Sequence, residues 1–255
     1  MTTAALPAPR RDWALFLDFD GTLVEIAESP DAVRTEHHLL ETLMTLSDKL
    51  GGALAIVSGR PVAEIDGHLD HARIAAAGLH GLEMRLKSGA PVRKLDATAL
   101  DSRIIAELRT VADAHEGLLL EDKGAAVALH YRNRPDLEAL CLEAAEAAVA
   151  GRPALGLLRG KMVVEIKSAS SDKGRAVRRF MDTAPFAGRK PVFVGDDVTD
   201  EDGFRAASAL GGFGIKVGEG ETVARWRIDS VAEFLRWLAA MPDRLGDLEG
   251  ETIGR

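Results

Sequence analysis

The sequence has little cysteine: Cys141 is the only one among its 255 residues. A single cysteine cannot form an internal disulfide, and no cysteine–histidine spacing suggests a zinc site. We interpret Cys141 as a small apolar core residue and expect a cytoplasmic location. The chain also lacks an apolar run of about 18 residues, the length that a membrane span needs. Residues 1–13, MTTAALPAPRRDW, contain no apolar stretch of signal-peptide length.

Runs of positive charge are absent too. Lys and Arg number 32 against 40 Asp and Glu, which gives a formal net charge of −8. A nucleic-acid-binding domain usually presents a basic face, so nucleic acid is not expected as a partner. Neither a membrane nor an obligate protein partner is indicated. If such an acidic protein binds a phosphate, it must supply local cations, either a metal or a few well-placed Lys and Arg side chains.

Short apolar runs alternate with helical patterns in the first and last thirds of the chain. Buried strands are predicted at residues 13–19, 53–57, 73–77, 191–194 and 212–217, and helices at 36–50, from Pro61 onward, and at 172–181, 200–210 and 230–240. This rhythm predicts an α/β fold, a doubly wound, Rossmann-like parallel sheet with helices on both faces. Functional side chains are expected at the carboxyl ends of its strands.

The middle of the chain has a different order of elements. Helices are predicted at residues 99–115 and from Pro135 onward, and strands at 118–121, 126–131, 154–158 and 162–166. Strand pairs joined by short turns indicate an antiparallel sheet with both helices on one face. We therefore predict a core of residues 1–99 and 169–255, with an inserted α+β cap domain (αββαββ) at residues 100–168.

The strongest chemical signal is DFDGTLVE, residues 18–25. Two carboxylates directly after a buried strand, Asp18 and Asp20, are unfavourable unless a divalent cation compensates them. Asp18 can then be both a metal ligand and a nucleophile that accepts a phosphoryl group. Asp20 can protonate the leaving oxygen and later deprotonate the attacking water. Gly21 lets the backbone approach a phosphate closely, and Thr22 offers a hydroxyl to fix Asp20.

These residues resemble the haloacid dehalogenase superfamily of phosphohydrolases, whose DxDxT motif matches Asp18, Asp20 and Thr22. The superfamily's other motifs should follow later strands. Ser58 in IVSGR matches the phosphate-binding Ser/Thr, and Lys173 in SDKG matches the lysine that neutralises the charge of the nucleophile and the phosphoryl group. The resemblance thus implies five catalytic residues, and it places them on both sides of the predicted cap.

The acidic metal motif of the superfamily matches Asp196 and Asp197 in GDDVTDED. The resemblance implies Mg²⁺ as the cofactor, and Mg²⁺ prefers oxygen ligands in octahedral geometry. The expected ligands are Asp18, Asp20 through its backbone carbonyl, Asp196 and Asp197. Asp200 is expected to hold metal-bound waters from outside the shell of ligands.

Further segments resemble the trehalose-6-phosphate phosphatase family: GLHGLE (78–83), EDKGAAVALHYR (121–132), RGKMVVEIK (159–167) and GDDVTDEDGF (195–204). This resemblance covers roughly residues 13–240. It implies hydrolysis of trehalose 6-phosphate to trehalose and phosphate through an aspartyl-phosphate, the last step of trehalose biosynthesis. The residues expected to bind this small sugar phosphate are Gly59, Arg60, His80, Glu121, Lys123, Arg132, Lys161 and Glu165.

The substrate residues have the right chemistry, because carboxylates accept hydrogen bonds from vicinal hydroxyls and Lys or Arg donate to sugar oxygens. Alternate residues of a strand share a face, so Lys161 and Glu165 are expected to face one ligand. The face of His130 is left open, and His80 could contact the site or brace its loop. The family usually has Pro where this chain has Ser168. Cap closure is expected about hinges near residues 97–101 and 167–171.

Three alternatives remain. A similar cap could select another sugar phosphate, of the sucrose or mannosylglycerate type, because selectivity can depend on a few contacts. A phosphomutase of the same superfamily would return the phosphoryl group to a hexose. A catalytically inactive regulatory or sugar-sensing protein is a different class, and the presence of Asp18, Asp20, Lys173 and Asp196 argues against it.

Overall fold

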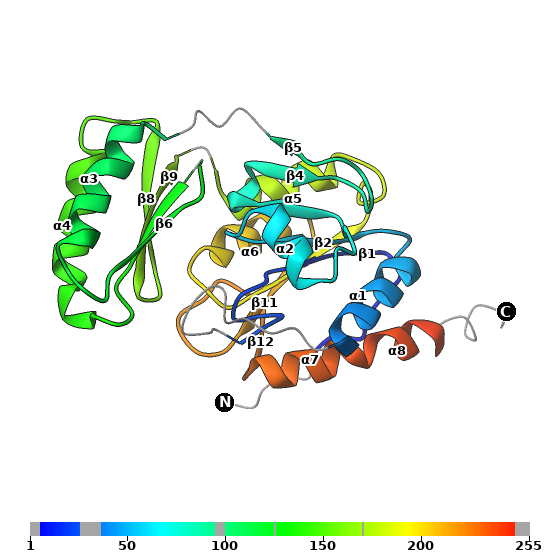
Figure 1. The fold of residues 1–255 in the computed structure, drawn as a ribbon. Coiled ribbons are helices and arrows are strands. Elements are labelled where there is room, and N and C mark those ends of the chain that lie inside the picture. Colours follow the sequence, from blue (N-terminus) through cyan, green and yellow to red (C-terminus); the bar gives the residue numbers. More distant parts are fainter. Residues whose placement is uncertain (1–5, 26–36, 95–99, 125, 170, 248–255) are drawn as a thin grey trace, which may run out of the picture. The chain divides into compact units, whose positions relative to one another are not determined.

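The computed structural model describes residues 6–25, 37–94, 100–124, 126–169 and 171–247 (Figure 1). The chain divides into two compact units, one made of Met1–Arg93 and Lys173–Arg255, the other of Lys94–Asp172. None of the helices in the described ranges is long and apolar enough to cross a membrane. The predicted helix starts at residues 36 and 99 and parts of both predicted hinges lie outside the described residues.

The first unit is built on an eight-stranded sheet of order β12-β11-β10-β1-β2-β3-β4-β5. Its strands are β1 (Trp13–Leu17), β2 (Leu54–Val57), β3 (Ala76–Gly78), β4 (Glu83–Arg85), β5 (Arg93–Lys94), β10 (Lys190–Gly195), β11 (Phe213–Val217) and β12 (Trp226–Ile228). All pairs from β12 to β3 are parallel, which confirms the doubly wound prediction. The strand β1 is central, with β10 and β2 as its neighbours.

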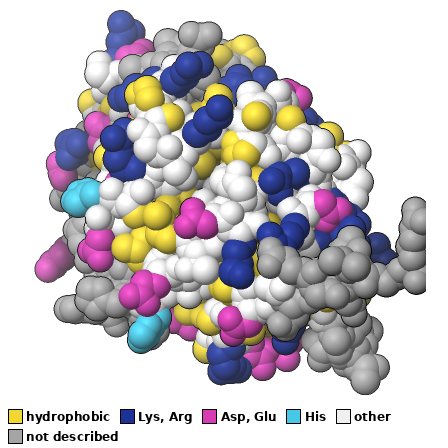
Figure 2. All heavy atoms as spheres, turned by 90° about the vertical axis from the view of Figure 1, so that its right-hand side faces the viewer, with side chains coloured by type: hydrophobic (Ala, Val, Ile, Leu, Met, Phe, Trp, Pro, Cys, Tyr) yellow, Lys and Arg dark blue, Asp and Glu magenta, His cyan; other side chains and the backbone are white. Residues whose placement is uncertain are grey.

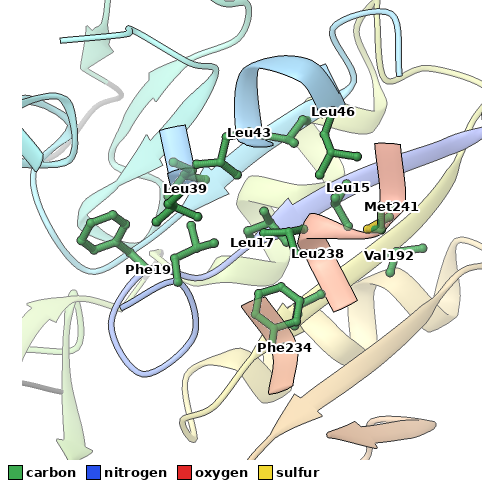
Figure 3. Close-up of a cluster of buried hydrophobic side chains, with 14 of the residues drawn as sticks. Leu15, Leu17, Phe19, Leu39, Leu43, Leu46, Val192, Phe234, Leu238 and Met241 are labelled. Carbon is green, nitrogen blue, oxygen red and sulfur yellow. The ribbon is translucent and has the colours of Figure 1, made fainter. Parts of the chain in front are cut away.

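Helices cover both faces of this sheet (Figure 1). They are α1 (His37–Lys49), α2 (Val62–His68), α5 (Lys173–Met181), α6 (Asp200–Ala209), α7 (Val231–Ala239) and α8 (Met241–Asp247). On one face, Leu15 and Leu17 of β1 pack among apolar side chains of α1, α7 and α8, as Figure 3 shows. On the other face, Phe16 stacks on Phe186 and contacts Phe180 of α5. Because successive side chains of β1 point to opposite faces, this strand contributes to the apolar layers on both sides of the sheet.

Four short elements, β4, β5, β12 and α8, were not predicted. The strand β4 is antiparallel to β3, so the sheet is mixed rather than wholly parallel. Its sequence, Glu-Met-Arg, gives no apolar run, yet Arg85 is buried because Asp66 of α2 binds it through two hydrogen bonds of 2.7 and 2.5 Å. A buried charge is tolerated only with such a partner, and sequence patterns do not show the partner.

The second unit has a four-stranded antiparallel sheet of order β6-β7-β9-β8. Its elements are α3 (Ser102–Asp113), β6 (Leu119–Asp122), β7 (Ala126–His130), a 3₁₀ turn (Pro135–Leu137), α4 (Glu138–Val149), β8 (Leu155–Gly160) and β9 (Val163–Ser168). Both helices lie on one face of the sheet (Figure 1) and share an apolar cluster with it that contains Cys141. The predicted αββαββ order is confirmed, and Cys141 is fully buried.

The surface carries charges of both signs. On the face drawn in Figure 2, acidic and basic side chains are intermixed among the described residues. This agrees with a composition of 40 acidic and 32 basic residues. The net charge of −8 does not favour an anionic ligand, so such a ligand must be attracted by particular side chains or by a metal.

Candidate active site

Asp18 lies directly after the central strand β1, at its carboxyl end. Its backbone N–H donates to the Val194 carbonyl oxygen of β10 at 2.9 Å, and only 4% of the residue is exposed. The neighbouring strands end beside it: Ser58 follows β2, and Asp196 follows β10. The carboxyl ends of parallel strands meet at one edge of a sheet, which is where ligands bind in doubly wound folds.

Lys173, the first residue of α5, joins two buried carboxylates. Its Nζ donates to Asp18 Oδ1 at 2.5 Å and to Asp200 Oδ1 at 2.7 Å. Burial lowers the pKa of Lys173, but Asp18 and Asp200 more than offset this, so the pKa lies above the ordinary lysine value. Lys173 is therefore a fixed positive charge in contact with Asp18, as the resemblance implies.

One carboxylate oxygen of each of Asp18, Asp196 and Asp200 lies within 4.8 Å of the other two, and we call this group the carboxylate triad. Burial, followed by the charge of Asp200, raises the pKa of Asp18 well above its ordinary value, and Lys173 only partly opposes this. Burial and Asp200 likewise raise the pKa of Asp196 to about 7. The triad thus holds more negative charge than Lys173 compensates.

The triad fits a divalent cation. Among the described residues, the buried Oδ1 of Asp196 has no hydrogen-bond partner, and buried polar atoms are rarely left so. Carboxylate oxygens are the ligands that hard cations take. A Cβ on Gly21 would lie 2.1 Å from Asp196 Oδ2, so only glycine lets the Asp196 carboxylate lie against the backbone at this position. The φ of Gly21, +79°, also favours glycine.

Asp200 has a larger role than the sequence prediction gave it. Its Oδ2 accepts from the backbone N–H groups of Asp196 and Asp197 at 3.0 and 2.9 Å, while Oδ1 accepts from Lys173. Asp200 is fully buried, and burial raises its pKa. One carboxylate therefore orients both the acidic loop after β10 and the lysine beside Asp18. The side chain of Asp197, also predicted as a metal ligand, is not part of the triad. Ligation by the Asp20 backbone carbonyl stays a prediction.

Thr22 and Asp20 do not interact as predicted. The Thr22 hydroxyl donates to Asp18 Oδ2 at 3.4 Å and so fixes Asp18 rather than Asp20. Both oxygens of Asp20 instead accept from Arg60, from Nε and Nη2, at 2.7 Å each. Position along the chain suggested Thr22 as the partner, but the tight turn after β1 brings its hydroxyl back toward Asp18.

Ser58, Gly59 and His80 lie together at the end of β2. Ser58 is buried, and its Oγ accepts from the Arg60 backbone N–H at 3.1 Å. The His80 backbone N–H donates to the Ser58 carbonyl oxygen at 3.0 Å, and a Cβ on Gly59 would lie 3.0 Å from the His80 ring. His80 is buried in a 3₁₀ turn (Leu79–Gly81) with φ of 54°. It braces the Ser58 loop, which was one of the two roles left open.

Four polar residues of the second unit, Glu121, Lys123, His130 and Glu165, form what we call the cap polar cluster. Lys123 Nζ donates to Glu165 Oε2 at 2.9 Å and lies 3.7 Å from Glu121 Oε2. His130 Nε2 lies 2.8 Å from the same Glu121 oxygen. Burial raises the pKa of Glu121, but His130 and Lys123 more than offset this, so its pKa is lowered overall.

The cap polar cluster lies on the sheet face that the helices leave uncovered. In the register of the sheet, Ala128 of β7 pairs with Glu121 on one side and Glu165 on the other. The adjacent residues, Leu129 of β7 and Val164 of β9, point to the opposite face of the sheet and belong to the apolar cluster with α3 and α4. His130 is therefore on the polar face, which the sequence left open.

The predicted alignment of Lys161 with Glu165 is wrong. Lys161 lies in the turn between β8 and β9, so strand alternation does not reach it. It is exposed, and its backbone carbonyl oxygen accepts from Arg132 Nη2 at 3.4 Å. Arg132 and Lys161 thus lie side by side at one end of the sheet, whereas Glu165 belongs to the cap polar cluster.

Lys216 is a buried residue of the site that was not predicted from the sequence. This residue is 5% exposed on β11, where it pairs with Gly195, and its Nζ donates to the Asp196 carbonyl oxygen. A lysine inside the otherwise apolar strand Phe213–Val217, next to a predicted strand end, was the available signal. Lys216 adds a second buried cation beside the acidic loop.

The fold of the chain resembles that of a haloacid dehalogenase-like hydrolase from B. subtilis, which superposes with a TM-score of 0.64 over 90% of this chain and 99% of that chain. At 12% identity this likeness supports the fold alone. A family model described as trehalose-phosphatase matches residues 16–232. The chain belongs to the trehalose-phosphatase family.

Named relatives agree with this membership. The trehalose-6-phosphate phosphatase of Escherichia coli is 43% identical over 89% of this chain and 85% of its own length. A probable trehalose-phosphate phosphatase of Sinorhizobium fredii is 47% identical over 84% of this chain and 81% of its own. The C-terminal domain of a Candida albicans trehalose-6-phosphate phosphatase superposes with a TM-score of 0.79 over 95% of this chain and 99% of that domain. At 22% identity it supports the fold alone.

Proposed function

We propose that this chain is a Mg²⁺-dependent phosphatase that hydrolyses trehalose 6-phosphate to trehalose and phosphate. The observation that carries the chemistry is the pairing of buried Asp18 with Lys173 beside two further carboxylates. The choice of trehalose 6-phosphate as the substrate is supported by a relative named for it, which matches 89% of this chain. A cytoplasmic location stays a prediction.

The metal would be held by Asp18 and Asp196. Asp200 would support them through its hydrogen bonds with Lys173 and with the backbone of the Asp196 loop. When bound, the metal would supply positive charge that keeps Asp18 ionised and that offsets the charge of a phosphate. Mg²⁺ suits the site because all the side-chain ligands are carboxylate oxygens. A backbone carbonyl of Asp20 and the side chain of Asp197 stay predicted contributors.

In the proposed reaction an Asp18 oxygen attacks phosphorus, and the bond from phosphorus to the sugar oxygen breaks. The Asp20 carboxyl gives its proton to the departing sugar oxygen, which leaves as trehalose. Asp20 then takes a proton from water, and the water oxygen attacks phosphorus, which releases phosphate and restores Asp18. Lys173 and the Ser58 hydroxyl stabilise the negative charge on the phosphoryl oxygens in both steps.

We assign recognition of the sugar to the cap polar cluster, with Arg132 and Lys161 as further candidates. Glu121 and Glu165 offer acceptors for hydroxyl groups, and Lys123 offers a donor between them. Because Glu165 is only 5% exposed, a hydrogen bond that it makes to a sugar is shielded from water. His80 and Gly59 support the Ser58 loop rather than contact the sugar.

Binding of Mg²⁺ should stabilise the protein through Asp196. With Mg²⁺ at about 100 times its Kd, the gain is about 2.7 kcal/mol, or roughly 5–10 °C in Tm for a chain of this size. Asp196→Asn should lose most of this shift, whereas Asp202→Asn, at an exposed position of α6, should keep it. Thermal unfolding with Mg²⁺ and with EDTA measures both. An unchanged shift in Asp196→Asn would contradict the metal assignment.

The same variant has an opposite effect without metal. Because burial and Asp200 raise the pKa of Asp196 to about 7, its contribution favours the folded state at low pH and is lost as pH rises from about 4 through 7. Asp196→Asn removes this loss, so in EDTA at pH 8 the variant should have a Tm equal to or above that of wild type. A clear drop in Tm would show that the carboxylate stabilises the metal-free fold.

Glu165→Ala should separate recognition of the sugar from the chemistry. Loss of one hydrogen bond to a charged group should lower kcat/KM for trehalose 6-phosphate by about 10- to 100-fold. For p-nitrophenyl phosphate, which has no sugar, the change should be less than about 3-fold. Glu143→Ala, at an exposed position of the same unit, is the control. Equal losses on both substrates would mean that Glu165 does not bind the sugar.

The substrate is tested by phosphate release over a panel of trehalose 6-phosphate, sucrose 6-phosphate, glucose 6-phosphate and mannose phosphates, with Mg²⁺ and with EDTA. A metal-dependent kcat/KM that is highest for trehalose 6-phosphate is expected. A maximum on another sugar phosphate would favour that substrate while keeping the Asp18 chemistry. Absence of release from every member would favour the phosphomutase or the non-enzymatic alternative.

A further inference from the structure

Arg60 follows the Ser58–Gly59 turn at the end of β2, and its guanidinium is committed to Asp20. Nε donates to Asp20 Oδ2 and Nη2 to Oδ1, both at 2.7 Å. Two parallel bonds of this kind fix the plane and the direction of a carboxylate, which a single bond does not. The Arg60 side chain is 10% exposed, whereas that of Asp20 is 37% exposed.

The guanidinium is itself held from the other side. Nη1 lies 3.2 Å from His68 Nε2 and 3.5 Å from Glu64 Oε2, both on α2. The guanidinium carbon lies 5.7 Å from the centre of the Phe19 ring, and that ring contacts the His68 ring at 5.5 Å. Each nitrogen of the Arg60 guanidinium therefore has a neighbour within the first unit, and the Phe19 ring limits sideways movement of the guanidinium.

We propose that Arg60 is a positioning residue for Asp20 and not a ligand of the substrate. The inference rests on the proposed function, in which Asp20 gives a proton to the leaving sugar oxygen. Arg60 holds this carboxyl group, which is otherwise partly exposed, in one orientation at the turn after β1. His68 and Glu64 act one step further back, because they keep the guanidinium in place.

A positioning role makes a specific kinetic prediction. The value of kcat/KM covers the steps up to departure of the leaving group, when the bond to Asp18 forms. A sugar alkoxide is a poor leaving group and needs the proton from Asp20, whereas p-nitrophenolate leaves without one. Misplacing Asp20 should therefore lower kcat/KM for the sugar phosphate and leave kcat/KM for the aryl phosphate nearly unchanged.

The test compares Arg60→Lys and Arg60→Met with wild type on trehalose 6-phosphate and p-nitrophenyl phosphate. Lysine keeps the charge but cannot make the paired bonds. Both variants should lose about 10- to 100-fold in kcat/KM on trehalose 6-phosphate through kcat, with little change in KM. The loss on p-nitrophenyl phosphate should be below about 3-fold.

A double-mutant cycle checks that Arg60 acts through Asp20. In the Asp20→Asn background, Arg60→Lys should cause no further loss on trehalose 6-phosphate. Equal losses on both substrates through KM would overturn the proposal in favour of a phosphate ligand. If the Arg60 variants do not fold, His68→Gln is the deciding variant. It should lower kcat/KM for trehalose 6-phosphate by about 3- to 10-fold, about the effect of one hydrogen bond, and leave kcat/KM for p-nitrophenyl phosphate unchanged. An inactive wild-type chain would instead overturn the proposed function.

Discussion

Asp18→Asn should lower the turnover of trehalose 6-phosphate by about 10⁴-fold or more, because an amide cannot form the acyl phosphate. The fold should persist. Asparagine has nearly the same shape, and Lys173 keeps its 2.7 Å contact with Asp200. The substitution also removes one of three clustered negative charges, and burial together with Asp200 makes the ionised form of Asp18 unfavourable. We therefore expect a metal-free Tm no lower than that of wild type.

The measurements are phosphate release and thermal unfolding of the same preparation. Asp202→Asn is a matched control, since it removes a carboxylate two residues after Asp200 at a side chain that is half exposed. It should keep both activity and Tm. Turnover of Asp18→Asn near the wild-type rate would show that another group accepts the phosphoryl group.

Lys173→Met should produce the second-largest effect. It removes the cation that contacts Asp18 at 2.5 Å and Asp200 at 2.7 Å, in a place where both carboxylates are almost fully buried. Loss of one well-placed charge opposite a developing anion should reduce kcat by about 10²- to 10³-fold. Lys173→Arg should not restore activity, because a larger planar guanidinium does not fit a residue that is 3% exposed.

The same variant should be destabilised. Breaking a buried ion pair on one side costs about 3–5 kcal/mol, since the remaining carboxylates have lost their partner. The control is Lys87→Met, at an exposed lysine of the first unit, which should change neither kcat nor Tm. In the Asp18→Asn background, Lys173→Met should cost less stability, because one of the two carboxylates is already neutral. Full additivity would contradict the direct coupling of these side chains.

Much of this site could be predicted because parallel strands bring distant residues together. Asp18, Ser58 and Asp196 each follow an apolar run directly, so their meeting at one sheet edge follows from the fold class. The long strands and amphipathic helices were predictable for the same reason, since a regular apolar pattern is a property of the local sequence.

What could not be predicted depends on contacts between side chains. Arg60 was expected to bind substrate, but its direction is set by Asp20 and His68, which lie 40 residues before it and eight after it. Thr22 was given the wrong carboxylate because a turn decides which acid its hydroxyl reaches. Asp200 was predicted only to hold metal-bound waters, because its hydrogen bonds to Lys173 and to the backbone of the acidic loop depend on the folded arrangement. The strand β4 was missed because Asp66 makes its buried arginine tolerable.

The central claim is that Asp18 accepts the phosphoryl group, and a covalent intermediate tests it most directly. Wild-type protein is mixed with trehalose 6-phosphate and Mg²⁺, quenched in acid within one turnover, digested and examined by mass spectrometry. We expect one added phosphoryl group on the peptide that contains residues 18–25, absent in EDTA and in Asp18→Asn. Metal-dependent release of phosphate without any modification of that peptide, or with modification at another residue, would contradict the account.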